Sequence, residues 1–240
     1  MALFDSLKKA FGGRDDGQKP EPSRAASSQA SPVDAVNNSR LTKEATRAIV
    51  ARITSQDELK QVAAGAWLNN DARIAALERI GDKAFLAQRA IEDQVVPVKL
   101  RAIDLIDDAS LLLGIWKRER NTPAWREVAQ HAEERAKQIV EHLDNQDELA
   151  RFAVCESTAC RRAATERVAD KGLLARIALG DADNTDVWTR RTAIARIDDR
   201  SVLKKVLKKR SPWEDDYKDA EKRLEKLDNP SSGDDDDEEW

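Results

Sequence analysis

Aliphatic residues recur three and four positions apart over residues 41–227, with polar residues between them. The segments IAALERI at 74–80 and TAIARI at 192–197 show this spacing, which is typical of amphipathic helices. Each such helix ends in an aliphatic anchor, followed by a short turn with Asp or Asn and by a second helix with Leu in its first turns. The anchors are Ile53, Ile80, Ile106, Leu143, Val168 and Ile197, at intervals of 27, 26, 37, 25 and 29 residues.

The recurrence predicts an all-α fold. A single helix pair cannot bury its own apolar face, so near-copies of a pair are expected to stack on one another. We expect a right-handed α-solenoid of about six stacked helix pairs over residues 41–227. The interval of 37 residues departs from the repeat, because a break at 121–123 is followed by an unusually long predicted helix over 123–143.

Local signals agree with these helix starts. Three pairs of residues have the spacing of a capping box, in which side chains satisfy free amides at a helix N-terminus. Three prolines stand where the first turn of a helix tolerates them. The capping pairs are Ser55 with Glu58, Asn145 with Glu148, and Ser211 with Glu214, and the prolines are Pro97, Pro123 and Pro212.

The two ends of the chain differ from the repeats. Residues 1–12 predict a short amphipathic helix with Leu3, Phe4, Leu7 and Phe11 on one face, which could touch a membrane surface weakly or dock in a partner's groove. Residues 13–40 are rich in Gly, Ser, Pro and charge and predict a disordered linker. Residues 228–240 carry seven acidic and no basic side chains and predict a disordered acidic tail.

Composition narrows the class of protein. Hydrophobic residues make up 40% of the chain and charged residues 36%, enough apolar content for a core. Removing both ends from the total of 41 basic and 45 acidic residues leaves 35 and 33 over 41–227, so no strong field favours a nucleic acid. The chain lacks a membrane-spanning stretch, and two cysteines fit a reducing compartment. We expect a cytoplasmic protein, with a peripheral place at the inner membrane as an alternative.

The unit of aliphatic anchor, Asp turn, Leu-bearing helix and Arg at the next helix start resembles the HEAT-like repeats of bacterial type. The resemblance covers residues 41–227. It implies a concave platform that binds another protein, because most proteins of this family act in that way. One bacterial branch consists of alkylpurine DNA glycosylases, which hold duplex DNA in the concavity, and this branch implies a nucleic-acid-binding alternative.

A basic residue lies seven positions before four of the anchors, and further arginines lie close by. Stacking would align these residues into a ladder that binds phosphate or an acidic partner. The alternative is that they form ion pairs with turn carboxylates of adjacent repeats. The ladder consists of Arg73, Lys99, Arg161 and Arg190, with Arg101, Arg162 and Arg191 nearby, and the turn carboxylates are Asp82, Asp107, Asp170 and Asp198.

The densest basic cluster consists of Lys204, Lys205, Lys208, Lys209 and Arg210. Cations also favour a helix C-terminus, so a solvated helix end is the plain interpretation. The sharper hypothesis is that the tail DDDDEEW at 234–240 folds back on the cluster and competes with an outside anionic partner. The tail also resembles the C-terminal tips of bacterial and phage single-stranded DNA-binding proteins, with Trp240 as the anchor, or it only solubilises the chain.

Catalytic chemistry has little support in the sequence. Cys155 and Cys160 lack two further zinc ligands nearby and are expected to be buried packing residues, and His131 and His142 are too far apart to share a metal. Trp67, Trp116, Trp125 and Trp188 either stack on bases or fill gaps between repeats. We therefore expect a non-enzymatic protein-binding scaffold or adaptor, with no cofactor, no metal and no small-molecule substrate.

Overall fold

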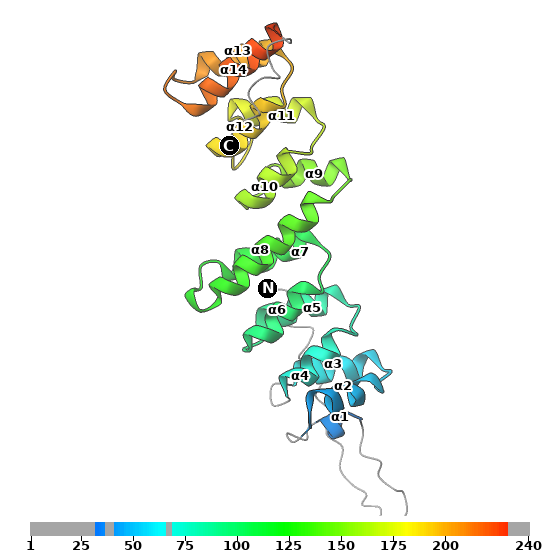
Figure 1. The fold of residues 1–240 in the computed structure, drawn as a ribbon. Coiled ribbons are helices and arrows are strands. Elements are labelled where there is room, and N and C mark those ends of the chain that lie inside the picture. Colours follow the sequence, from blue (N-terminus) through cyan, green and yellow to red (C-terminus); the bar gives the residue numbers. More distant parts are fainter. Residues whose placement is uncertain (1–31, 37–40, 66–68, 230–240) are drawn as a thin grey trace, which may run out of the picture. The chain divides into compact units, whose positions relative to one another are not determined.

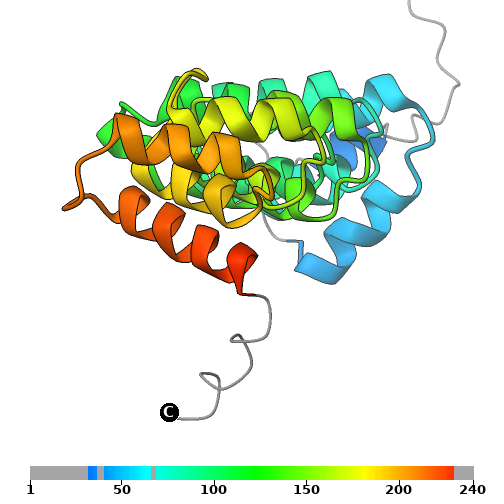
Figure 2. The same cartoon turned by 90° about the horizontal axis from the view of Figure 1, so that it is seen from above.

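The computed structural model describes residues 32–36, 41–65 and 69–229, and these ranges contain helices and turns but no strand. The all-α prediction is confirmed for this part of the chain. The described helices fall into two layers that run side by side (Figures 1 and 2). None of these helices is long and apolar enough to cross a lipid bilayer.

The first layer holds the helices that lead into the anchors, and α14 continues it. Each helix of this row packs against the next one in the row. Small side chains at the contacts, Ala102, Ala132, Ala136 and Ala164 among them, are fully buried and allow close approach. The row consists of α2 (Lys43–Ala51), α4 (Asn70–Leu77), α6 (Val96–Asp104), α8 (Arg126–Glu141), α10 (Thr158–Thr165), α12 (Val187–Ala195) and α14 (Asp215–Asp228).

The second layer holds the Leu-bearing helices and is packed less evenly. In this row α5 contacts α7 and α11 contacts α13, whereas α3 with α5, α7 with α9 and α9 with α11 share few contacts or none. The row consists of α3 (Gln56–Ala64), α5 (Lys83–Glu92), α7 (Ala109–Glu119), α9 (Gln146–Phe152), α11 (Lys171–Leu179) and α13 (Arg200–Lys209). The 3₁₀ helix η2 (Pro123–Trp125) leads into α8.

The two helices that pack most closely on each other are not the two helices of one sequence repeat. Helices joined by the Asp turn, such as α2 and α3, share few contacts. The second helix of each pair packs on the first helix of the next pair instead, as in α3 with α4, α5 with α6, α7 with α8 and α11 with α12. The Asp turn thus connects successive packing units.

Most of the predicted helix starts are confirmed, with one correction. Ser55 Oγ accepts a hydrogen bond from the Glu58 amide at 3.4 Å, and Pro97 lies in the first turn of α6. Glu214 accepts a bond from the Ser211 amide at 3.0 Å, but α14 begins only at Asp215. The prediction that Pro212 opens this helix is therefore wrong, because the capping interaction spans a turn before the helix.

The anchors lie in the core as expected, with Leu143 half-buried and the other five at most 5% exposed. A second correction concerns the predicted linker over 13–40. Residues Pro32–Val36 form the short helix α1, which packs against α2 and α3 and buries Val36. Proline at the first helical position and two valines three residues apart explain this turn of helix.

Candidate protein-binding surfaces

The predicted basic ladder lies inside the stack of helices. Arg73, Lys99 and Arg161 are at most 3% exposed, and the side chain of Arg190 is 12% exposed. Each forms an ion pair with a carboxylate 20 to 26 residues further along the chain. The pairs are Arg73–Asp93, Lys99–Glu119, Arg161–Asp186 and Arg190–Asp216. These four cations are therefore engaged by carboxylates within the protein.

The turn carboxylates that the sequence offered as partners have other roles. Asp82 pairs with Lys60 at 2.7 Å and caps α5, whereas Asp107 and Asp198 pair with Lys83 and Arg223. Asp170 accepts hydrogen bonds from the first amides of α11. The ion-pairing alternative thus describes the ladder, but the predicted partners are wrong. The acids that pair with the ladder lie at the loops inside the packing units, such as the loop between α5 and α6, and not in the Asp turns.

The buried ammonium group of Lys99 is surrounded by groups that stabilise its charge. Its ammonium group donates to the Ile91 carbonyl oxygen at 2.6 Å, lies 3.9 Å from the Glu119 carboxylate and lies 4.1 Å from the centre of the Trp125 ring. Burial lowers the pKa of Lys99, although Glu119 opposes this effect. Trp125 therefore covers a buried cation, and the gap-filling interpretation applies to it.

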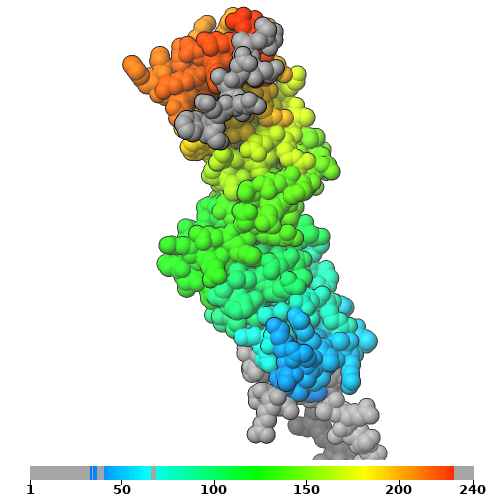
Figure 3. Space-filling view, in the orientation of Figure 1, coloured from blue at the N-terminus to red at the C-terminus, as the bar shows by residue number. Residues whose placement is uncertain are grey.

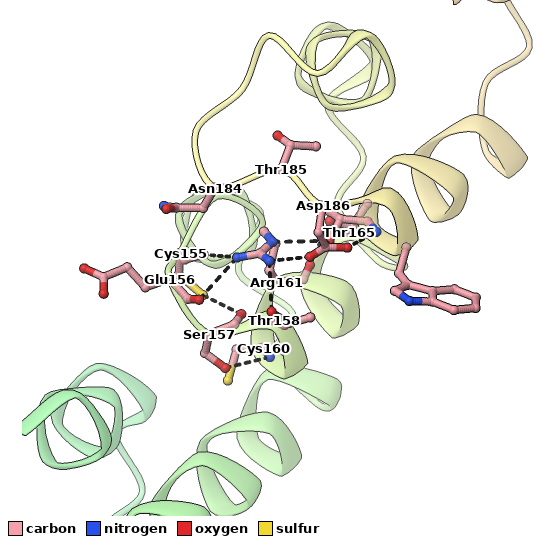
Figure 4. A network of polar contacts seen from close by, with 12 residues as sticks. Cys155, Glu156, Ser157, Thr158, Cys160, Arg161, Thr165, Asn184, Thr185 and Asp186 are labelled. Atoms are coloured by element: carbon pink, nitrogen blue, oxygen red, sulfur yellow. Dashed lines mark hydrogen bonds and ion pairs between the residues drawn. The ribbon is translucent and has the colours of Figure 1, made fainter. Parts of the chain in front are cut away.

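Arg161 joins three segments of the chain (Figure 4). It donates to the Cys155 carbonyl oxygen at 2.7 Å, to Thr158 Oγ1 at 3.1 Å and, through Nε, to Thr189 Oγ1 at 3.2 Å, in addition to its ion pair with Asp186. These bonds fix the loop before α10 and the N-terminus of α12. Because its donors are engaged within the protein, Arg161 is a structural residue.

The next residue, Arg162, points outward and creates a different kind of site. Its guanidinium group lies 5.7 Å from the centre of the Trp188 ring, and the guanidinium group of Arg191 lies 5.1 Å from the same ring. Trp188 is 56% exposed and the adjacent Val187 is 41% exposed. Arg191 also bonds Asp219 at 2.6 Å, which holds its position. We call Arg162, Val187, Trp188 and Arg191 the Trp188 surface.

The remaining predicted basic residues differ in their availability. Arg101 bonds Glu78 at 3.0 Å on the first row. Arg210 is half-buried and donates to the Leu179 carbonyl oxygen at 3.3 Å, and Lys209 pairs with Asp181 at 2.5 Å. No ion pair within the described ranges involves the exposed side chains of Lys204, Lys205 and Lys208.

A hollow with an apolar lining lies between α7 and α9, where the second row is loosely packed. It has a volume of about 580 Å³. Glu156, which follows the lining residue Cys155, pairs with Lys117 and, at 3.1 Å, with Arg120. The floor consists of Leu113, Ile139, Leu143, Phe152 and Cys155. Sequence reasoning noted the long interval here but did not find the hollow, which follows from the extra length of α8.

Residues that could hold a metal ion do not gather in the described part of the chain. His131 contacts Asp104 at 2.7 Å and His142 contacts its own helix at 2.8 Å, so the two histidines lie apart. Burial raises the pKa of Cys160 to about 12 and also raises that of Cys155. Both thiols are thereby kept in the neutral, unreactive form.

Some predicted contact residues fall outside the described ranges. These residues are Leu3, Phe4, Leu7 and Phe11 of the predicted N-terminal helix, Trp67, and Trp240 at the C-terminus. Comparisons of the chain with protein-family models, with curated proteins and with solved structures find no match.

Proposed function

We propose that this protein is a non-enzymatic protein-binding scaffold or adaptor, built on a right-handed α-solenoid that resembles the HEAT-like repeats. The solenoid is supported by two rows of helices in which each helix of the first row packs on the next one in that row. The observation that carries the binding function is the Trp188 surface.

An exposed tryptophan between two arginines has the composition of an interaction hot spot. Trp and Arg are the residue types most enriched among interface residues whose loss costs more than 2 kcal/mol. The fold does not need this ring for its core, since 56% of Trp188 stays exposed. Trp116 and Trp125, by contrast, pack against the core. The position of Trp188 thus favours a contact with another molecule.

The hollow between α7 and α9 supplies a second binding position, on the other row of helices. Its apolar floor and polar rim have the character of a site that receives apolar side chains of a partner. Two separate surfaces on one chain are what an adaptor requires. The nucleic-acid alternative is less favoured, because Arg73, Arg161 and Arg190 are largely buried and ion-paired within the protein.

The test compares two exposed tryptophans. Trp188→Ala removes the centre of the proposed surface, whereas Trp213→Ala removes a ring that is 87% exposed in the loop before α14 and lacks flanking arginines. A partner is identified by cross-linking the full chain in its native extract and is then purified. We expect Trp188→Ala to weaken its binding about 30-fold, the equivalent of about 2 kcal/mol, and Trp213→Ala to leave it unchanged. Equal effects of the two variants would contradict the proposal.

A further inference from the structure

The outward side of α13 carries basic residues and no acidic ones. Leu203 and Val206 face the core and are fully buried. The polar positions of the helix hold Arg200, Lys204, Lys205, Lys208 and Lys209, which we call the α13 basic stripe. The spacing of three and four residues places these side chains next to one another along the helix.

Many basic residues in the described ranges form an ion pair with a carboxylate, but the three lysines in the middle of the stripe do not. At its two ends Arg200 bonds Asp228 at 2.9 Å and Lys209 bonds Asp181 at 2.5 Å. Between them Lys204, Lys205 and Lys208 are exposed, and no carboxylate of the described residues forms an ion pair with them. Like charges at this spacing repel one another, so an anionic partner would stabilise the stripe.

The structure also shows where the acidic tail begins. Arg200 donates to the Leu227 carbonyl oxygen at 2.6 Å and holds Asp228. The last turn of α14 therefore lies against the first turn of α13, at one end of the stripe. The neighbouring helix α14 carries six acidic and four basic residues, so it offers the tail no comparable surface.

We propose that the α13 basic stripe is the docking surface for the acidic C-terminal segment of the same chain, residues 234–240. The segment carries six acidic side chains. Six residues lead from Asp228 to Asp234 and span at most about 20 Å. Lys208 lies eight residues along α13 from Arg200, about 12 Å away. The segment can therefore reach every lysine of the stripe.

Tethering makes this contact effective although each exposed ion pair is weak. A short tether gives an effective concentration in the millimolar range, and several pairs form together. The docked segment would cover the stripe, so an acidic partner must displace it before binding there. This inference does not depend on the Trp188 surface.

The experiment uses full-length protein and a synthetic peptide of residues 228–240 as the probe. In one variant the tail carboxylates at 234–239 are replaced by their amides, which frees the stripe. We expect this variant to bind the peptide at least about tenfold more tightly than the wild type, whose own tail competes. We also expect that affinity to fall steeply as salt is raised.

A matched pair of substitutions tests the location. In the neutral-tail background, Lys204→Glu with Lys208→Glu should abolish binding of the peptide. Lys218→Glu with Lys222→Glu makes the same charge change at two exposed positions four residues apart on α14, and binding should stay within about threefold of the parent, because exposed charges off the surface matter little.

A second measurement does not need the peptide. Acetylation rates of Lys204, Lys205 and Lys208, followed by mass spectrometry at low salt, should be lower in the wild type than in the neutral-tail variant. Equal rates together with equal peptide binding would overturn the proposal. Protection that grows with protein concentration would place the segment on a second copy and overturn the assignment to the same chain.

Discussion

Replacing Asp93 with asparagine would remove one charge from a pair that is almost fully enclosed. The side chains of Arg73 and Asp93 are 3% and 1% exposed. Asp93 Oδ1 also accepts a hydrogen bond from the Val95 amide at 2.9 Å, just before α6. Asparagine keeps an oxygen for that bond, so the substitution isolates the loss of charge.

The expected loss of stability follows from the charge of Arg73, which stays buried without its counter-charge. Burial, with the nearby charge of Arg89, already lowers the pKa of Arg73, which shows that the guanidinium group is held in unfavourable surroundings. Breaking a buried ion pair typically costs about 3–5 kcal/mol, because the remaining ion loses its counter-charge. We expect Asp93→Asn to cost about 3 kcal/mol, a large part of the roughly 5–15 kcal/mol by which domains are stable.

Urea unfolding followed by circular dichroism measures this loss. Hydrogen exchange of the α4 and α6 amides detects it even if the repeats do not unfold together. The control is Asp107→Asn, which breaks the exposed pair with Lys83 and should cost less than about 1 kcal/mol. The double variant Arg73→Met with Asp93→Leu should recover most of the loss. A cost of Asp93→Asn below about 1 kcal/mol would refute the reasoning.

Two further predictions concern titratable groups. Burial by itself would raise the pKa of Asp186, but hydrogen bonds from Arg161 and Thr189 lower it more, so its folded-state pKa lies below the usual value. The ionised Asp186 therefore stabilises the protein fully above its unfolded-state pKa of about 3.9, and this stabilisation is lost as the pH falls further. The Tm of the wild type should consequently drop more steeply below pH 4 than the Tm of Asp186→Asn. Cys160 is fully buried and its pKa is raised to about 12, so a thiol reagent at neutral pH should label it only after unfolding. Rapid labelling of Cys160 in the native protein would contradict this.

The helices and most of their limits could be predicted because they depend on local chemistry. The aliphatic spacing identifies the buried side of each helix, and a residue such as Ser55 or Asn145 caps the helix that follows it. The anchors could be predicted for the same reason, since Ile106 and Val168 follow directly on a helix whose apolar face is buried.

The partners of the ladder could not be predicted, because they depend on which helices pack together. Asp93 lies at the end of α5, Glu119 in the last turn of α7, Asp186 at the start of α12 and Asp216 in the first turn of α14. No constant spacing from the anchors links these four acids. The roles of the tryptophans could not be predicted for the same reason, since Trp125 covers Lys99 whereas Trp188 stays exposed.

Two Arg–Arg doublets show how the interior and the surface of this fold are linked. Successive residues of a helix point about 100° apart, so Arg161 and Arg190 enter the ladder while Arg162 and Arg191 lie outside against Trp188. The ladder fixes α10 and α12 relative to each other through Asp186. The Trp188 surface is therefore held by the same buried ion pair that joins the two helices, and breaking that pair should disturb the surface as well as the stability of the protein.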